Sequence, residues 1–350
     1  MRPAGREVPE MRKLDIFNHI FPKQFYELMM EIAPEQEDMG KRVRGVPMLY
    51  DLDERFRVMD RFDDYQQILS LASPPIEVLG EPDVSERLAR AANDGMAELC
   101  QKHPERFPSF VASLPMNSPD GLVTEARRAV SELDACGVQT FSNVKGKPLD
   151  APEILPLFDV MAELDLPIWI HPARPASHAD YPTEDKSRYE IWWTFGWPYE
   201  TSAAMARIVF SGLFDKHPKL KIITHHMGGM IPYFEGRVGP GWDQLGSRTS
   251  DEDLTVVLER LKKRPYDYFK MFYADTAVFG ARAATECGLS FFGAEHVLFA
   301  SDSPFDPEKG PMYIRQTIEI VDGLDVSDDD RGKIYRNNAL KLLKLNGSAS

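Results

Sequence analysis

Two stretches that lie far apart in the chain decide the fold, LDIFNHIFP at residues 14–22 and FASDSPF at residues 299–305. Each is an apolar strand that runs into a polar tip, with His19 in the first and Asp302 in the second. Two more stretches of this form lie between them, PIWIHP at residues 167–172 and IITHHMGG at residues 222–229. Buried strands that end in His or Asp predict one polar site at one end of a barrel.

Eight apolar runs alternate with helical patterns along the whole chain, with no break in composition. The runs are continuous rather than alternating, which is typical of strands buried on both faces. This order predicts a single (β/α)8 domain of the TIM-barrel type over residues 1–350, with residues 1–12 as a flexible arm. The predicted strands are residues 13–19, 65–71, 107–114, 138–144, 167–170, 220–224, 269–274 and 296–300.

The composition argues against several classes of partner. The chain has 41 basic and 55 acidic residues, a formal net charge of −14, whereas nucleic-acid binders need basic faces. No stretch has the roughly 18 uninterrupted apolar residues of a membrane span. Residues 1–12 are not followed by the hydrophobic segment of a signal peptide. The three cysteines are scattered, which favours reduced thiols, so we expect a cytoplasmic protein without a membrane partner.

Histidines concentrate where a barrel of this type has its active site, at the C-terminal ends of the strands. His19, His171, His225 and His226 lie there, together with Asp302. Any one of these histidines could be a core residue bonded to a backbone carbonyl. Burying three imidazoles and a carboxylate at one point would cost free energy unless an ion bound their nitrogen and oxygen atoms. The set therefore predicts a metal site.

The surroundings of that site can also be inferred. Residues 172–198 form the longest irregular stretch, and long insertions in compact domains are usually functional. Trp193 and Trp197 in this stretch suit a planar substrate and a lid that excludes water, with a satellite hydrophobic core or a subunit contact as the alternative. Lys145 and Arg174 lie near strand ends and could bind a substrate carboxylate, although lone charges are more often solvated.

The chain resembles the amidohydrolase superfamily, in the branch of aminocarboxymuconate-semialdehyde decarboxylase and the resorcylate and dihydroxybenzoate decarboxylases. The resemblance implies a distorted (β/α)8 barrel with one divalent ion, which we expect to be zinc, with manganese or iron as alternatives. The motifs that carry it span nearly the whole chain in the expected order: residues 15–22, NVKGKPLDAP at 143–152, IHP at 170–172, HMGG at 226–229 with Pro232 and Gly236-Arg237, and ASDSPF at 300–305.

The resemblance also implies roles for single residues. His19, His171 and Asp302 would bind the ion, and Asp302 would also take part in catalysis. His226 would be the catalytic acid or base beside the ion. Arg237 matches a position that holds a substrate carboxylate in relatives, often across a dimer interface, although a surface ion pair would explain it equally well.

One position departs from the family pattern. The first strand of the family carries His-x-His, or Glu-x-His in some decarboxylases, whereas this chain has FNH at residues 17–19. Phe17 cannot bind a metal. His225, Asn18 or Asp15 could be the substitute ligand, or the site could be empty. Adjacent residues of a strand point to opposite faces, so both histidines of IITHHMGG could face the ion only if the strand ends between them.

Three functions follow from these observations. The leading hypothesis is a metal-dependent non-oxidative decarboxylase, or a hydrolase, of a small aromatic or unsaturated carboxylate. Two histidines and one carboxylate also form the site of non-haem iron oxygenases, so an iron or manganese oxygenase on the same barrel is the second. The third is a metal-poor subunit that needs a paralogous partner. We accordingly expect either a homodimer or a hetero-oligomer with a paralogue.

Overall fold

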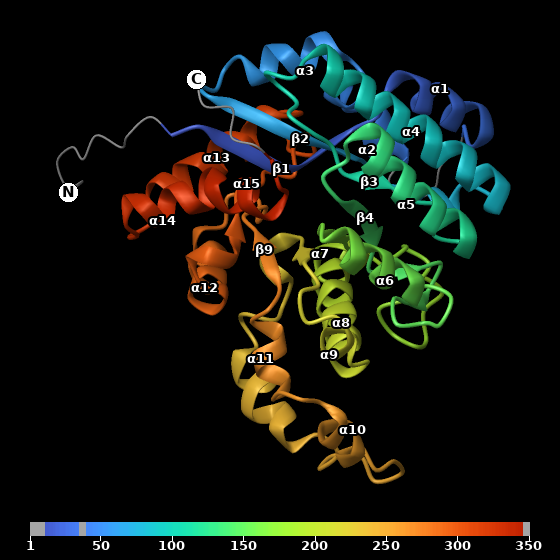
Figure 1. The fold of residues 1–350 in the computed structure, drawn as a ribbon, viewed down its shortest axis with the longest axis vertical. Helices are drawn as coiled ribbons and strands as arrows, with labels where there is room; N and C mark the ends of the chain where they lie inside the picture. The colour runs from blue at the N-terminus through green and yellow to red at the C-terminus, as the bar shows by residue number, and fades with distance from the viewer. Residues whose placement is uncertain (1–10, 35–39, 346–350) are drawn as a thin grey trace.

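The structure is a computed structural model that describes residues 11–34 and 40–345 (Figure 1). Within these residues, eight parallel strands each overlap one of the predicted runs, so the predicted strand order is confirmed. The strands are β1 (Lys13–Ile20), β2 (Tyr65–Leu71), β3 (Ala112–Ser113), β4 (Val138–Phe141), β7 (Ile168–His171), β8 (Ile222–Thr224), β9 (Tyr273–Asp275) and β10 (Val297–Leu298). Most of the expected flexible arm, residues 1–10, lies outside the described residues.

Backbone hydrogen bonds close the strands into a barrel. Six strands form one sheet in the order β10-β9-β8-β7-β4-β3, and β1 pairs with β2. A parallel bridge between Leu69 and Phe110 joins β2 to the segment before β3. On the other side, the Ile16 N–H donates to the Phe299 carbonyl over 3.0 Å and so joins β1 to the end of β10. The prediction of a distorted (β/α)8 barrel is confirmed.

Helices cover the outside of this barrel (Figure 1). Most of them lie between successive strands, as the alternating pattern predicted. Their bounds are α1 (Lys23–Ile32), α2 (Gly40–Arg44), α3 (Leu52–Met59), α4 (Pro82–Lys102), α5 (Pro119–Leu133), α6 (Leu155–Leu164), α7 (Ile191–Thr194), α8 (Gly196–Phe210), α9 (Leu213–Lys216), α10 (Thr255–Arg260), α11 (Pro265–Phe269), α12 (Arg282–Phe292), α13 (Pro311–Asp322), α14 (Asp328–Gly332) and α15 (Asn338–Leu342).

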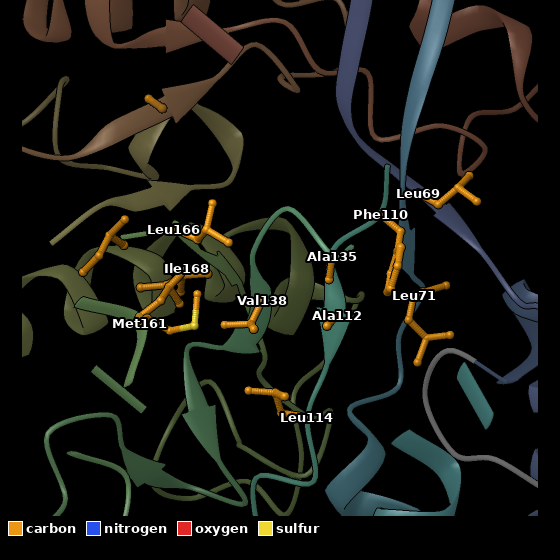
Figure 2. Close-up of a cluster of buried hydrophobic side chains, with 14 of the residues drawn as sticks. Leu69, Leu71, Phe110, Ala112, Leu114, Ala135, Val138, Met161, Leu166 and Ile168 are labelled. Atoms are coloured by element: carbon orange, nitrogen blue, oxygen red, sulfur yellow. The ribbon is translucent and has the colours of Figure 1, made fainter. Parts of the chain in front are cut away.

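Alternate residues of the strands belong to two hydrophobic clusters. Ile68, Trp169 and Ile223 belong to one cluster with residues of β1 and β10, which is possible only if their side chains point into the barrel. Their neighbours, among them Leu69 and Ile168, pack in the larger cluster under the helices (Figure 2). Because successive side chains of a strand point to opposite faces, both sides of each strand are buried in apolar surroundings.

Helix α5 illustrates how the local sequence sets an element's bounds. The Ser118 hydroxyl accepts a hydrogen bond from the Gly121 N–H over 3.2 Å, and Pro119 occupies the first turn. A side-chain oxygen at this position satisfies an N–H that has no partner within the helix. The helix ends at Asp134, whose φ of 59° is left-handed. Short polar residues tolerate that conformation better than most, so Asp134 can stop the helix without a glycine.

Part of the chain projects away from the barrel. In Figure 1 the segment that carries α10 and α11 extends beyond the helices that surround the strands. The same part of the chain begins with η4 (Arg237–Gly241). Arg237 is exposed there.

None of the helices in the described ranges is long and apolar enough to cross a membrane. The cysteines, Cys100, Cys136 and Cys287, are all unpaired.

Arg55 ties α3 to the first two strands and to the backbone of a predicted site residue. Its side chain is fully buried, and Nη1 donates to Asn18 Oδ1 over 3.1 Å and to Gln67 Oε1 over 2.6 Å. The remaining donors reach the backbone carbonyls of His19 and Met48. A buried guanidinium that serves four acceptors fixes the end of β1 in place.

Replacing Arg55 with leucine should therefore destabilise the protein. We expect Arg55→Leu to lower the free energy of unfolding by about 3–5 kcal/mol, because buried acceptors lose their donor. Urea unfolding followed by circular dichroism measures the loss. Arg57→Leu is the matched control, since Arg57 lies on the same helix and its side chain is 69% exposed. A comparable loss in both variants would contradict the assignment.

Candidate metal centre

Side chains from four parts of the chain meet at the C-terminal ends of the strands. His19, His171, His225 and Asp302 each offer one ligand atom, and these four atoms lie within 4.8 Å of one another. All four residues are buried. Nitrogen and oxygen ligands sit about 2.0–2.2 Å from zinc, so ligands on opposite sides of one ion are about 4.2 Å apart. The geometry and the donor types both fit a single divalent ion.

Asp302 is at the centre of this group. Its Oδ1 lies 2.8 Å from His19 Nε2 and 3.2 Å from His225 Nε2. Burial disfavours the charged carboxylate, but hydrogen bonds from the surrounding histidines outweigh it and hold the pKa of Asp302 well below its ordinary value. The carboxylate is therefore ionised, which is the form that binds a cation.

His225 is oriented by a second carboxylate. Its Nδ1 lies 2.5 Å from Asp275 Oδ2, which leaves Nε2 facing Asp302. Burial alone would lower the pKa of His225, but the charges of Asp275 and Asp302 outweigh burial and raise it to about 9. A carboxylate that fixes one imidazole nitrogen and leaves the other for the ion is the usual support of a metal-binding histidine.

His171 is oriented by the backbone instead. Its Nδ1 lies 2.7 Å from the Pro172 carbonyl oxygen, which can only accept a hydrogen bond. Nδ1 therefore carries the proton, and Nε2 has a lone pair that is free to bind an ion. Burial, followed by the neighbouring imidazoles, lowers the pKa of His171 well below its ordinary value. A neutral imidazole with a free nitrogen is the form that binds metals.

The two adjacent histidines both face the centre because β8 ends at Thr224, before either of them. His226 has a left-handed φ of 53°, which turns the chain sharply. The rings of His225 and His226 lie 3.8 Å apart, and His226 Nε2 is 3.7 Å from Asp302 Oδ2. The opposite-face rule for strand residues therefore does not apply here. His226 Nε2 is buried and has no hydrogen-bond partner among the described residues.

Phe17 forms an apolar wall where the family pattern has a ligand. Its ring lies 4.1 Å from that of His225 and 5.0 Å from that of His19, measured between centroids. His225 is thus packed against the residue that replaces the missing ligand.

The other two candidate substitutes are engaged elsewhere. The amide nitrogen of Asn18 donates to the carbonyls of Asp15 and Ile68. The Asp15 carboxylate accepts hydrogen bonds from the hydroxyls of Tyr65 and Ser301. Neither residue belongs to the group of potential ligands in the described part of the chain. Of the three substitutes that the sequence left open, only His225 joins the cluster.

A cavity of about 590 Å³ opens beside the cluster. Phe141 and Trp197, which both line it, hold their rings 5.0 Å and 5.4 Å from that of His171. Its other walls come from the segment after β2 and from the loop that follows β7. The lining residues are Ala33, Ser73, Pro74, Pro75, Val78, Leu79, Phe141, Asn143, Lys145, Gly146, Pro172, Ala173, Arg174, Pro175, His178, Trp192 and Trp197.

The predicted substrate-binding residues differ in where they lie. Lys145, Arg174 and Trp197 line the cavity. Trp193 is not in the lining and packs edge-on against Trp197, with ring centroids 6.4 Å apart. Arg237 is exposed on the projecting segment, where its guanidinium lies 5.7 Å from the centre of the Phe234 ring, and it does not reach this cavity.

Sequence analysis did not identify one residue of the cavity that contacts the cluster. Phe141 is the last residue of β4 and lies against His171. The rule that the C-terminal ends of barrel strands carry the site would have found it, had that rule been applied to apolar as well as polar residues.

The protonation of His225 leads to a prediction about metal binding. Metal-free protein should bind one Zn²⁺ and release about one proton near pH 7.5, because His225 must lose the proton that its pKa of about 9 retains. The apparent affinity should consequently rise with pH up to about 9. Calorimetry in two buffers of different ionisation enthalpy measures both quantities.

Two variants test the same assignment. His225→Gln should release fewer protons and bind Zn²⁺ more than about 10-fold more weakly. His178→Gln is the control, because His178 lines the cavity but is not part of the cluster. Unchanged proton release in His225→Gln would rule out His225 as a ligand.

Comparisons with known proteins were made on this background. A family model described as "Amidohydrolase" matches residues 40–345. A gamma-resorcylate decarboxylase from Rhodococcus jostii (strain RHA1) is 35% identical over 308 residues, which cover 84% of this chain and 87% of that protein. A 2-amino-3-carboxymuconate-6-semialdehyde decarboxylase from Dictyostelium discoideum is 28% identical over 348 residues, or 95% of this chain and 92% of that protein.

Solved structures agree with the sequence relatives. A dihydroxybenzoic acid decarboxylase from Polaromonas sp. JS666, crystallised with manganese and the inhibitor 2-nitroresorcinol, superposes with a TM-score of 0.76 at 28% identity. The match covers 96% of this chain and 98% of that one.

Proposed function

Because this chain belongs to the amidohydrolase family, in the branch that its sequence motifs indicated, we propose that it is a metal-dependent enzyme that removes CO₂ from a small aromatic carboxylate without oxidation. One observation carries the proposal: four buried ligand atoms from four strand ends lie within 4.8 Å of one another, beside a cavity walled by aromatic rings. The relatives named as decarboxylases support the choice of reaction.

The reaction replaces a carboxylate by a proton: the carbon–carbon bond to the carboxylate breaks, CO₂ leaves, and the ring carbon takes up one proton. A divalent ion held by His19, His171, His225 and Asp302 would supply the positive charge that binds the acidic oxygens of the substrate and stabilises developing negative charge. The rings of Phe141 and Trp197 position a planar substrate and exclude water, which disfavours hydrolysis.

His226 is placed to handle the proton. It lies beside Asp302, and its Nε2 is buried without a partner in the described part of the chain. Burial, followed by the charge of His225, lowers the pKa of His226, so its imidazole is neutral and can exchange a proton through Nε2. The proposed part of Asp302 in catalysis is to orient His226, because its ionised carboxylate lies 3.7 Å from His226 Nε2.

The geometry favours this function over the other two. A facial iron site needs two histidines and one carboxylate with open positions, whereas His225 adds a third imidazole to the cluster. A metal-poor subunit is disfavoured because four donors remain buried together despite Phe17.

We place the enzyme in the cytoplasm, on the strength of its three unpaired cysteines.

We further propose zinc as the resident ion, although the Polaromonas relative holds manganese. Imidazole suits zinc, and carboxylate suits manganese. Compared with the members that carry Glu-x-His, an imidazole from His225 in place of the glutamate shifts the preference to zinc. Purified protein should contain zinc in excess of manganese by elemental analysis, and Phe17→Glu should move the ratio towards manganese. Leucine at the same position, Phe17→Leu, is the control that should leave the ratio unchanged.

Arg237 suggests a homodimer as the working assembly. It is exposed on the projecting segment and does not line the cavity of its own chain, so a role in substrate binding requires a second copy. A hetero-oligomer with a paralogue is the alternative. Mixing inactive His226→Gln chains with Arg237→Ala chains should restore activity if the sites are shared, and light scattering gives the oligomeric state.

Activity assays on the intact enzyme test the central proposal. The zinc- or manganese-loaded protein should convert 2,6-dihydroxybenzoate or a related aromatic acid to CO₂ and the decarboxylated ring, without consuming oxygen. His226→Gln should lower kcat/KM by at least about 100-fold at unchanged metal content, since proton transfer is worth that much. His217→Gln, at a histidine that is paired with Asp159 and does not line the cavity, should stay close to wild type. Oxygen uptake, or no turnover across a panel of aromatic acids, would defeat the proposal.

A further inference from the structure

A small polar chamber lies behind the wall of the substrate cavity. Its volume is about 10 Å³, which is room for one water molecule. Pro74 and Phe141 line both the chamber and the substrate cavity. Three residues of its lining, from the segment after β2 and from β3 and β4, carry a buried polar atom without a hydrogen-bond partner among the described residues. The atoms are Glu77 Oε1, Ser113 Oγ and Gln139 Oε1.

One water molecule would satisfy all three atoms. The Gln139 Nε2 group donates to the Leu71 carbonyl over 3.3 Å, so Oε1 is the atom left over, and it can only accept. The Ser113 hydroxyl can donate or accept. A water that donates to Gln139 and Glu77 and accepts from Ser113 makes three hydrogen bonds, which is typical of internal water.

Lys145 is the charged group that acts on Glu77. Burial raises the pKa of Glu77 to about 7, against the lowering effects of a backbone hydrogen bond and of the positive charge of Lys145. The other residues of the chamber carry no ionisable group. Pro75 and Val78, close to Glu77 in the chain, line the substrate cavity together with Lys145.

Lys145 is held at the substrate cavity by a tight hairpin. The hairpin consists of β5 (Asn143–Val144) and β6 (Lys147–Pro148), and Lys145 and Gly146 form its tip with φ of 51° and 84°. The side chain of Asn143 accepts from the Gly146 N–H over 2.9 Å and donates to the Ala173 carbonyl over 2.8 Å. A lysine in the left-handed region is strained, and such strain is usually kept for a functional reason.

The Lys145 ammonium is free to bind an anion. It makes no hydrogen bond or ion pair with the residues described, whereas Arg174 in the same cavity is paired with Glu200 over 2.9 Å. No described aspartate or glutamate lines the cavity, although the chain carries a net charge of −14. Lys145 is therefore the cation that an acidic substrate group would meet.

We propose that Glu77 is a positioning residue that acts through Lys145: its buried carboxyl, hydrated in the chamber, sets how strongly Lys145 attracts an anionic group of the substrate. The inference rests on the proposed function of the cavity as a carboxylate site. Protonated Glu77 leaves the charge of Lys145 undiminished, and ionised Glu77 partly cancels it. By linkage, an anion bound at Lys145 raises the proton affinity of Glu77, so binding is coupled to proton uptake.

Binding of isophthalate to the metal-loaded protein tests this coupling without requiring turnover. Both carboxylates of isophthalate stay ionised between about pH 6 and 8.5, so only the protein titrates. From pH 6 to pH 8.5, the affinity of wild-type protein for isophthalate should fall about fivefold more than that of Glu77→Gln. The glutamine is neutral at every pH, so Glu77→Gln should keep the tighter affinity that wild type shows at low pH. Lys145→Met should bind weakly at every pH, with no contribution from Glu77. Glu81→Gln, an exposed neighbour on the same loop, should behave as wild type.

Two further measurements keep the inference open to refutation even where a variant folds poorly. Calorimetry in two buffers at pH 7 should show net proton uptake when isophthalate binds wild-type protein, and less with Glu77→Gln. The melting temperature of Glu77→Gln should exceed that of wild type above pH 7 and match it near pH 4, because a carboxyl whose pKa is raised from 4.5 to about 7 costs stability as pH rises between these two values.

The outcomes separate this inference from the function on which it rests. Isophthalate binding without proton uptake, or identical pH dependence in wild type and Glu77→Gln, overturns the role of Glu77 and leaves the decarboxylase proposal intact. Failure of wild-type protein to bind isophthalate or any aromatic carboxylate overturns both. Unchanged affinity in Lys145→Met overturns the assignment of Lys145 and, with it, that of Glu77.

Discussion

The contact between Asp302 and His19 is the constraint on which the rest of the site depends. The backbone N–H of Asp302 donates to the Phe17 carbonyl over 3.0 Å, and its carboxylate lies 2.8 Å from His19 Nε2. The same few residues thus close the barrel and bring together two potential metal ligands from opposite ends of the chain. Burying a carboxylate among imidazoles is costly unless charges are shared, and an ion would meet that cost.

The loss of a first-strand ligand is compensated by where β8 ends. Had β8 continued through His226, one of its two histidines would have pointed away from the centre. The strand ends at Thr224, and Asp275 then orients His225 towards Asp302. Four potential donor atoms thus remain clustered despite the departure at Phe17. Relative to the Glu-x-His members of the family, an imidazole in place of a carboxylate bears on the choice of ion more than on the fold.

The charge of the whole molecule and the charge of its cavity have opposite signs. The chain carries a net charge of −14, whereas the described lining of the cavity includes Lys145 and Arg174 but no carboxylate. Glu77 is the nearby acid, and the fold keeps it behind the wall in a separate chamber. Because Glu77 lies outside the cavity, its protonation can change how strongly Lys145 attracts an anion. The cavity itself then needs no negatively charged side chain.

The sequence by itself indicated the barrel, because eight continuous apolar runs that alternate with helices are typical of parallel strands buried on both faces, and the motifs at their ends matched a barrel family. It also placed His19, His171 and Asp302 at strand ends, since motif and strand boundary coincide there. Only the tertiary structure decided among Asp15, Asn18 and His225, because that choice depends on hydrogen bonds to distant residues. It alone excluded Arg237 from its own cavity and brought Glu77, Ser113 and Gln139 around one chamber, because contacts between separate strands leave no periodic pattern in a single sequence.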